Sequence, residues 1–165
     1  EFNADADNLK HSLVDFLGQK DYVLIDAAAG TDEEVQAAIE ASDEVLLVSH
    51  PELPSLTNCL GAKKLAEQLD REILGLVLNS VRGEQSEVER DEIKDLVGAE
   101  IIGEVPDHKH VREGIALREP VVSYKPNSKA SHSIEDVAHR IRGEEPPERD
   151  FQSRFISRIQ SISPF

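Results

Sequence analysis

The stretch from Asp21 to Gly30 reads DYVLIDAAAG, and it decides the fold class. Its first part, Tyr22 to Ile25, is an uninterrupted apolar run that is too short for a helix and rich in residues that favour strands. A run of this kind predicts a strand that is covered on both faces, as in a parallel sheet. Asp26 ends the run, and small residues follow it. The pattern is typical of a nucleotide-binding sheet in which a strand ends at its ligand.

Asp26 allows two interpretations. A carboxylate at the carboxyl end of a parallel strand lies in the crevice where open α/β sheets bind ligands, and there it can hold a hydrated Mg²⁺. The three alanines that follow leave room for a phosphate, and Gly30 permits a close backbone approach or a positive φ angle. In the alternative interpretation, Asp26 only caps a turn before a helix that begins near Thr31.

Strands and helices alternate along the rest of the chain. Short apolar runs predict strands at residues 44–49, 73–78 and 100–105. Apolar residues at helical spacing predict helices near 9–17, 31–39, 55–69, 88–97 and 134–141, with Thr31 as the N-cap of the second. Short segments at 111–116 and 120–122 precede the last of these helices. Repeated βα units predict a doubly wound, mostly parallel sheet with flanking helices.

The composition fits one globular domain followed by a tail. A formal charge of −15 over 165 residues argues against a nucleic-acid partner, because neutralising phosphates needs clustered Lys and Arg. Such acidity suits a protein dissolved in high salt, so a halophilic source is a hypothesis. Cys59, the sole cysteine, is predicted to be a small buried hydrophobe and fits a reducing cytoplasm.

Three parts of the chain are expected to have different roles. Residues 1–142 form the predicted α/β domain, and 143–150, which include GEEPP, form a stiff polar linker. Residues 151–165 form a tail whose large apolar side chains fall on one side of a helical wheel, with two arginines at or beyond its edge. These residues are Phe151, Phe155, Ile156, Ile159 and Ile162, with Arg154 and Arg158. The tail is therefore predicted to be an amphipathic helix that lies on a membrane or packs on protein.

Four motifs, taken in order, resemble the MinD/ParA family of deviant-Walker P-loop ATPases, and its MinD-like branch in particular, over residues 21 to about 141. DAAAG at 26–30 is similar to the family motif DxPAG, with Ala28 in place of the proline. HPELPSLTN at 50–58 is similar to xPExxSxxD, with Asn58 in place of the aspartate. The other two are LGLVLNSV at 74–81 and IIGEVPDHKHVREGIALREPVV at 101–122, similar to family segments that bind the base.

The resemblance implies an incomplete P-loop NTPase fold with ATP and Mg²⁺ as cofactors. Asp26 would hold a magnesium-bound water, and Gly30 would present its backbone N–H to the terminal phosphate. Asn79 would read the adenine, whose edge needs the donor and the acceptor that an amide offers. Pro106 and Asp107 would flank the base.

The resemblance also implies a nucleotide-gated switch. ATP would join two subunits into a homodimer, with Glu52 near the interface between them. Paired tails would then hold the inner face of the cell membrane by avidity, and hydrolysis would release them. A protein of this kind is cytoplasmic and peripheral at the cell membrane, and with a protein partner it positions division or other cell-surface machinery.

The family's phosphate loop, of the form KGGxGKT, does not occur in these 165 residues. Because that loop supplies the lysines and amides that position the phosphates, we expect the chain alone not to hydrolyse ATP. Two explanations follow: the chain is the C-terminal part of a longer ATPase, or it is a catalytically silent adaptor that binds a protein partner and the membrane. A receiver domain fits poorly because Asp26 lacks neighbouring acids. A zinc site at His108 and His110 is not expected either, because the two histidines lack further ligands at zinc spacing.

Overall fold

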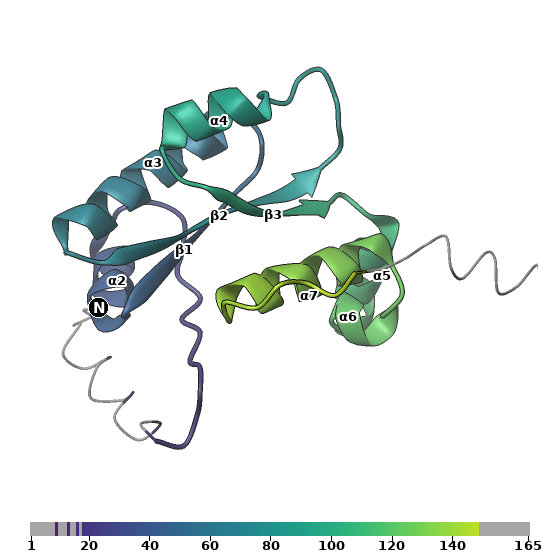
Figure 1. The fold of residues 1–165 in the computed structure, drawn as a ribbon, viewed down its shortest axis with the longest axis horizontal. Helices are drawn as coiled ribbons and strands as arrows, with labels where there is room; N and C mark the ends of the chain where they lie inside the picture. Colours follow the sequence, from purple (N-terminus) through teal and green to yellow (C-terminus); the bar gives the residue numbers. More distant parts are fainter. Residues whose placement is uncertain (1–8, 10–12, 14–15, 17, 149–165) are drawn as a thin grey trace, which may run out of the picture.

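A computed structural model describes residues 9, 13, 16 and 18–148. Within them, β1 (Glu44–Ser49), β2 (Glu72–Val81) and β3 (Ile101–Pro106) form one parallel sheet in the order β1-β2-β3 (Figure 1). The helices are α2 (Glu33–Ala41), α3 (Leu53–Gln68), α4 (Arg90–Val97), α5 (Lys109–Leu117), α6 (Val121–Tyr124) and α7 (Lys129–Ile141). The predicted α/β class, with a parallel sheet and flanking helices, is confirmed.

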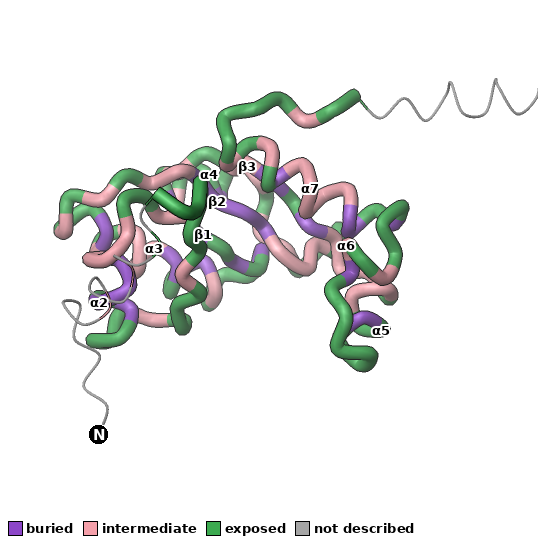
Figure 2. The backbone as a smooth tube through the Cα atoms, turned by 90° about the horizontal axis from the view of Figure 1, so that it is seen from below, coloured by how far each residue is buried: buried purple, intermediate pink, exposed green. Residues whose placement is uncertain are grey.

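Helices lie on both sides of the sheet. Figure 1 shows α3 and α4 on one side and α7 on the other, with α5 and α6 beside α7. Successive side chains of a strand point to opposite faces, so β1 contributes Leu47 to the cluster under α3 and Leu46 to the cluster under α7. Burial is concentrated in the strands and the helix faces against them, whereas α5 is mostly exposed (Figure 2).

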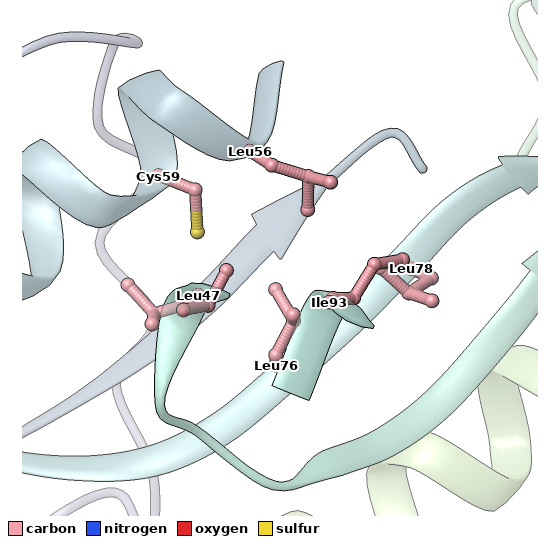
Figure 3. Close-up of a cluster of buried hydrophobic side chains, with 7 residues drawn as sticks. Leu47, Leu56, Cys59, Leu76, Leu78 and Ile93 are labelled. Carbon is pink, nitrogen blue, oxygen red and sulfur yellow. The ribbon is translucent and has the colours of Figure 1, made fainter. Parts of the chain in front are cut away.

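The main core lies between the sheet and helices α3 and α4. Its buried members are Leu47, Leu56, Cys59, Leu76, Leu78, Ile93 and Val97, most of them labelled in Figure 3. Burying a large aliphatic side chain stabilises the fold by about 1.5–3 kcal/mol relative to leaving it exposed. This cluster is therefore the main contact that holds α3 and α4 on the sheet.

A smaller core joins α7 to the opposite face of the sheet. It contains Val77 of β2, Val105 of β3 and Val137 of α7. Gly103 of β3 makes this close approach possible, because a Cβ atom at that position would overlap the side chain of Val137. The absence of a side chain at Gly103 thus lets α7 lie directly on β3.

The N-cap predicted for the helix after DAAAG is wrong by one residue. Asp32, not Thr31, caps α2, and its Oδ1 accepts the Val35 N–H at 3.1 Å. Both residue types cap helices, but a carboxylate also interacts favourably with the positive end of the helix dipole. The first helical residue is consequently Glu33.

The strand predicted at Tyr22 to Ile25 is also wrong. This segment has no regular secondary structure, and Tyr22, Val23 and Leu24 are 55%, 48% and 84% exposed. Figure 1 shows it as an irregular trace apart from the arrows of the sheet. A strand needs a neighbour to pair its backbone groups, and in the part of the chain that the structure describes the only partner of β1 is β2. In the structure, Tyr22 to Ile25 does not pair with the free edge of β1, so this segment forms no strand.

Two other sequence predictions fall partly or wholly outside the described residues. The helix expected near 9–17 is described only at residues 9, 13 and 16, and the tail at 151–165 is not described at all. Residues 143–148 follow α7 without forming a helix or strand. Over the described ranges, no helix is both long and apolar enough to span a bilayer.

Candidate functional site

The loops that follow the three strands are joined to one another at the carboxyl edge of the sheet. The Asp107 N–H after β3 donates to the carbonyl of Val81 at the end of β2, at 2.9 Å. The Val88 N–H, in the loop after β2, donates to the carbonyl of Pro51 after β1, also at 2.9 Å. Since ligands of open α/β sheets bind at this edge, the three loops form the candidate site.

Asn79 lies in a local irregularity at the end of β2. The pairing with β3 shifts register between Leu78 and Val81, and Ser80 has a left-handed backbone with φ of 57°. The Oδ1 atom of Asn79 accepts the Ser80 N–H at 2.9 Å, which stabilises this conformation. A bulge of this kind is a common way to redirect a side chain next to a site.

Two arginines bind the carboxylate of Asp107. Arg82 donates from Nε to Oδ2 at 3.0 Å, and Arg112 of α5 donates from Nη1 to Oδ1. The hydrogen bond from Arg82 holds the pKa of Asp107 below its ordinary value, and the charge and hydrogen bond of Arg112 act in the same direction against partial desolvation. Asp107 in turn raises the pKa of Arg82 by the same bond and by its charge. Asp107 is therefore ionised at neutral pH.

A second carboxylate holds the turn that carries Arg82. The Glu87 side chain accepts the backbone N–H of Arg82 at 2.6 Å and that of Gly83 at 3.1 Å. Arg90 at the start of α4 lies 3.6 Å from Glu87 and makes two hydrogen bonds to Glu104 of β3, at 3.1 and 2.9 Å. The turn after β2 is thus fixed to α4 and to β3.

The other predicted site residues lie in two places. Pro106 ends β3 and pairs with Val81, while Glu52 is the exposed N-cap of α3, and its charge contributes to the raised pKa of Arg82. Both therefore lie in the same region as Asp107. Asp26 and Gly30 lie instead in the irregular segment before α2, and the hydrogen bonds around Arg82 do not reach them.

The residues at the edge fit a purine base. An amide carbonyl has two lone pairs, so Asn79 keeps one acceptor position beside its bond to Ser80, and its NH₂ group has two donors. Among the described residues, no three His, Cys, Asp or Glu side chains gather as a metal site. Mg²⁺ keeps several waters and takes only one or two carboxylates, so a magnesium ligand need not belong to such a group. Asp26, the ligand expected from the sequence, is exposed in the loop before α2.

Sequence reasoning missed Arg82, Glu87 and Arg112. Their charges are visible in the sequence, but surface charges are common, and no motif marks them. Arg82 and Asp107 directly follow β2 and β3 in the structure, but the predicted strands end at residues 78 and 105. The sequence therefore did not mark the two residues as neighbours at one edge of the sheet.

Sequence comparison finds relatives whose names refer to ATP binding and to division. No family model matches the chain. An uncharacterized ATP-binding protein of Methanocaldococcus jannaschii is 34% identical over 140 residues, which is 85% of this chain and 53% of the relative. The septum site-determining protein MinD of Thermotoga maritima is 29% identical over 167 residues, 96% of this chain and 60% of the relative. The chain thus spans about half the length of these relatives.

Solved structures give the same picture for the fold. The septum site-determining protein MinD of Pyrococcus horikoshii, complexed with Mg-ADP, has a TM-score of 0.77 at 26% identity, over 83% of this chain and 56% of that one. The MinC:MinD cell division protein complex of Aquifex aeolicus has a TM-score of 0.77 at 27% identity, over 88% of this chain and 62% of that one.

Proposed function

This chain belongs to the MinD/ParA family, and on that premise we propose that it is the C-terminal part of a MinD-like, ATP-dependent, membrane-associating switch. The switch would position division or other cell-surface machinery. Within it, this chain would bind the base of the nucleotide and would carry the membrane anchor. The names of the relatives support cell division and ATP binding as the setting.

One observation carries the proposal: parallel pairing brings the ends of β2 and β3 together, and the ion pair between Arg82 and Asp107 joins them beside Asn79 and Pro106. Asn79 would donate to and accept from the adenine edge, and Pro106 and Asp107 would lie on either side of the base. Bound ATP with Mg²⁺ would supply the phosphoryl chemistry. The residues of this chain would orient the base and keep its edge hydrogen-bonded.

The phosphate side of the site would involve Gly30 and Asp26. Gly30 has a φ angle of 124°, which residues other than glycine rarely adopt. No heavy atom lies within 4 Å of the position that a Cβ atom would take there. The space on the Cβ side of Gly30 is therefore open, which would allow a phosphate to approach its backbone. Asp26 is exposed in the irregular segment before α2, where it could hold a magnesium-bound water.

A nucleotide titration tests the base-binding role in the natural full-length protein. Asn79→Ala is expected to weaken binding of a fluorescent ATP analogue by about tenfold, because the donor and the acceptor on the adenine edge would lose their partner. Asn127→Ala, at an exposed asparagine before α7, is the matched control and should bind like wild type. Equal affinities for wild type and Asn79→Ala would contradict the proposal.

The membrane role is proposed from the sequence of the tail. A flotation assay with vesicles that contain anionic lipid would compare the intact chain with one lacking residues 151–165. A second variant, Phe155→Ser with Ile159→Ser, keeps the length and charge of the tail but removes apolar surface. Both changes should reduce binding if the tail anchors the protein, because interfacial binding scales with buried apolar area. Equal binding by all three proteins would contradict the anchor.

Dimerisation and a protein partner complete the proposed switch. Glu52 would lie near the interface of an ATP-bound homodimer, and the MinC:MinD complex of Aquifex aeolicus is a precedent for a protein partner within the family. Light scattering with and without ATP would test the dimer. A mass that stays monomeric under saturating ATP would contradict it.

A specific observation favours a second candidate, a catalytically silent adaptor. Asn79 and Asp107 already have partners within the protein, namely the Ser80 N–H and the two arginines. An adaptor would use these bonds for stability alone and would bind a partner and the membrane without nucleotide. Undetectable ATP binding together with tail-dependent vesicle binding would establish this candidate over the first.

A further inference from the structure

Glu87 stands out among the acidic residues because its charge is largely buried. Its side chain is only 7% exposed, although it sits in a surface loop of charged and polar residues. Placing a carboxylate there costs desolvation free energy unless the carboxylate is hydrogen-bonded. The two backbone N–H groups of Arg82 and Gly83 supply those bonds, at 2.6 and 3.1 Å.

The turn that Glu87 binds contains a left-handed backbone. Gly83 has φ of 71°, and the preceding Ser80 is left-handed as well. Adjacent N–H groups that point to one side form a concave donor site for an anion, and the carboxylate of Glu87 occupies it. The direction in which the Arg82 side chain leaves the backbone therefore depends on this contact.

Glu87 also connects the turn to the rest of the fold. Arg90 approaches Glu87 at 3.6 Å while it binds Glu104 of β3 through two hydrogen bonds. The position of the turn is thus set relative to β3, the strand that Asp107 follows. Contacts therefore connect Glu104 through Arg90 and Glu87 to the backbone of Arg82, whose side chain binds Asp107.

We propose that Glu87 is a positioning residue, which fixes the turn after β2 and thereby places the Arg82 guanidinium against Asp107. Glu87 acts through Arg82 and does not itself touch the ligand. The importance of this placement for nucleotide binding rests on the proposed function. The position of the Arg82 side chain against Asp107 is a property of the protein without nucleotide, and it is tested in that form.

The test is an NMR titration of the Asp107 carboxyl carbon in the full-length protein without nucleotide. The variants are Glu87→Ala and the nearly isosteric Glu87→Gln, which guards against misfolding of the first. Glu84→Gln, in the same loop, removes the same charge from an exposed position and is the matched control. Amide exchange of Arg82 and Gly83 is measured on the same samples.

The direction of the shift separates positioning from simple charge removal. Loss of a nearby negative charge lowers the pKa of an aspartate, whereas loss of the Arg82 contact raises it. We expect the Asp107 midpoint to rise in both Glu87 variants, more in Glu87→Ala, and not in Glu84→Gln. We also expect the Arg82 and Gly83 amides to exchange about tenfold faster in Glu87→Ala, while the β2 amides stay protected.

An Asp107 midpoint that stays constant or falls in both Glu87 variants would overturn the inference, even if the two amides exchange faster. Binding of the fluorescent ATP analogue is measured separately on wild type. Wild type that fails to bind it would overturn the proposed function and leave the titration result standing. The two failures are therefore distinguishable.

Discussion

Arg82 donates from its Nε atom to Oδ2 of Asp107 at 3.0 Å, which joins the residues that directly follow β2 and β3. The two residues are 25 positions apart in sequence, and parallel pairing of the strands brings them together. Arg112 binds the other oxygen, so this carboxylate also holds α5 against the edge of the sheet. We expect protonation of Asp107 to break this ion pair and so to make the stability of the site depend on pH.

The first prediction concerns acid. The pKa of folded Asp107 lies below its ordinary value of 3.8, so its contribution to stability is present above that value and is lost as the pH falls through the folded pKa. Asp107→Asn should be less stable than wild type at pH 7, and the difference should shrink below about pH 3.8. Urea unfolding between pH 2.5 and 7 measures this. Asp95→Asn, at an exposed position of α4, is the control for removing a surface carboxylate elsewhere in the protein.

The second prediction concerns the contact between Gly103 and Val137. Gly103→Ala should destabilise the protein by about 1–3 kcal/mol, because the new methyl group overlaps the Val137 side chain. Combining it with Val137→Ala should cost less than the sum of the two single changes, since the smaller side chain makes room. Urea unfolding of the four proteins in this cycle gives the coupling. Strict additivity would show that α7 moves away instead of clashing.

The third prediction concerns Cys59. Its thiol points into the core cluster of α3 and the sheet, and burial raises its pKa to about 11 (Figure 3). Because the thiolate is the reactive form, Cys59 should react with a disulfide reagent at pH 7–8 only when the protein unfolds. The rate in native buffer and in urea measures this. A fast reaction in native buffer would mean that α3 opens readily from the sheet.

The α/β class and the parallel sheet were predictable because each strand carries its own signal. Val45 to Val48 and Leu76 to Leu78 are apolar runs of strand length. The sheet buries Leu76 to Leu78, whereas in the first run Leu47 is buried and Val48 is exposed. Most bounds of the elements shifted by one or two residues, as with Asp32, because several neighbouring residues can cap the same helix. The shift was larger for β2, which ends at Val81, and for α7, which begins at Lys129. Tyr22 to Ile25 carried the same apolar signal, but pairing with a neighbour is a tertiary property that local sequence does not encode.

The candidate site was only partly predictable. Asn79, Pro106 and Asp107 could be placed at one edge because each follows or ends a predicted strand. The partners of Asp107 could not be named, because a charged side chain in a loop reaches its partner through the exact course of the backbone. Glu87 shows this most clearly: its role depends on the orientation of two N–H groups in a turn with positive φ at Gly83.

The last prediction compares substitutions in the exposed segment before α2 and in the core by their effect on the free energy of unfolding. Leu24 is 84% exposed and Leu47 is 3% exposed, although both occur in apolar runs of strand-like sequence. Leu24→Ser should therefore change the free energy of unfolding of these 165 residues by no more than about 0.5 kcal/mol. Leu47→Ala, a truncation in β1, should cost about 2–5 kcal/mol because it leaves a cavity under α3. Urea unfolding decides between them, and amide exchange at residues 22–25 should be fast. If Leu24→Ser costs as much as Leu47→Ala, Leu24 is packed in solution and the segment pairs with a sheet edge after all.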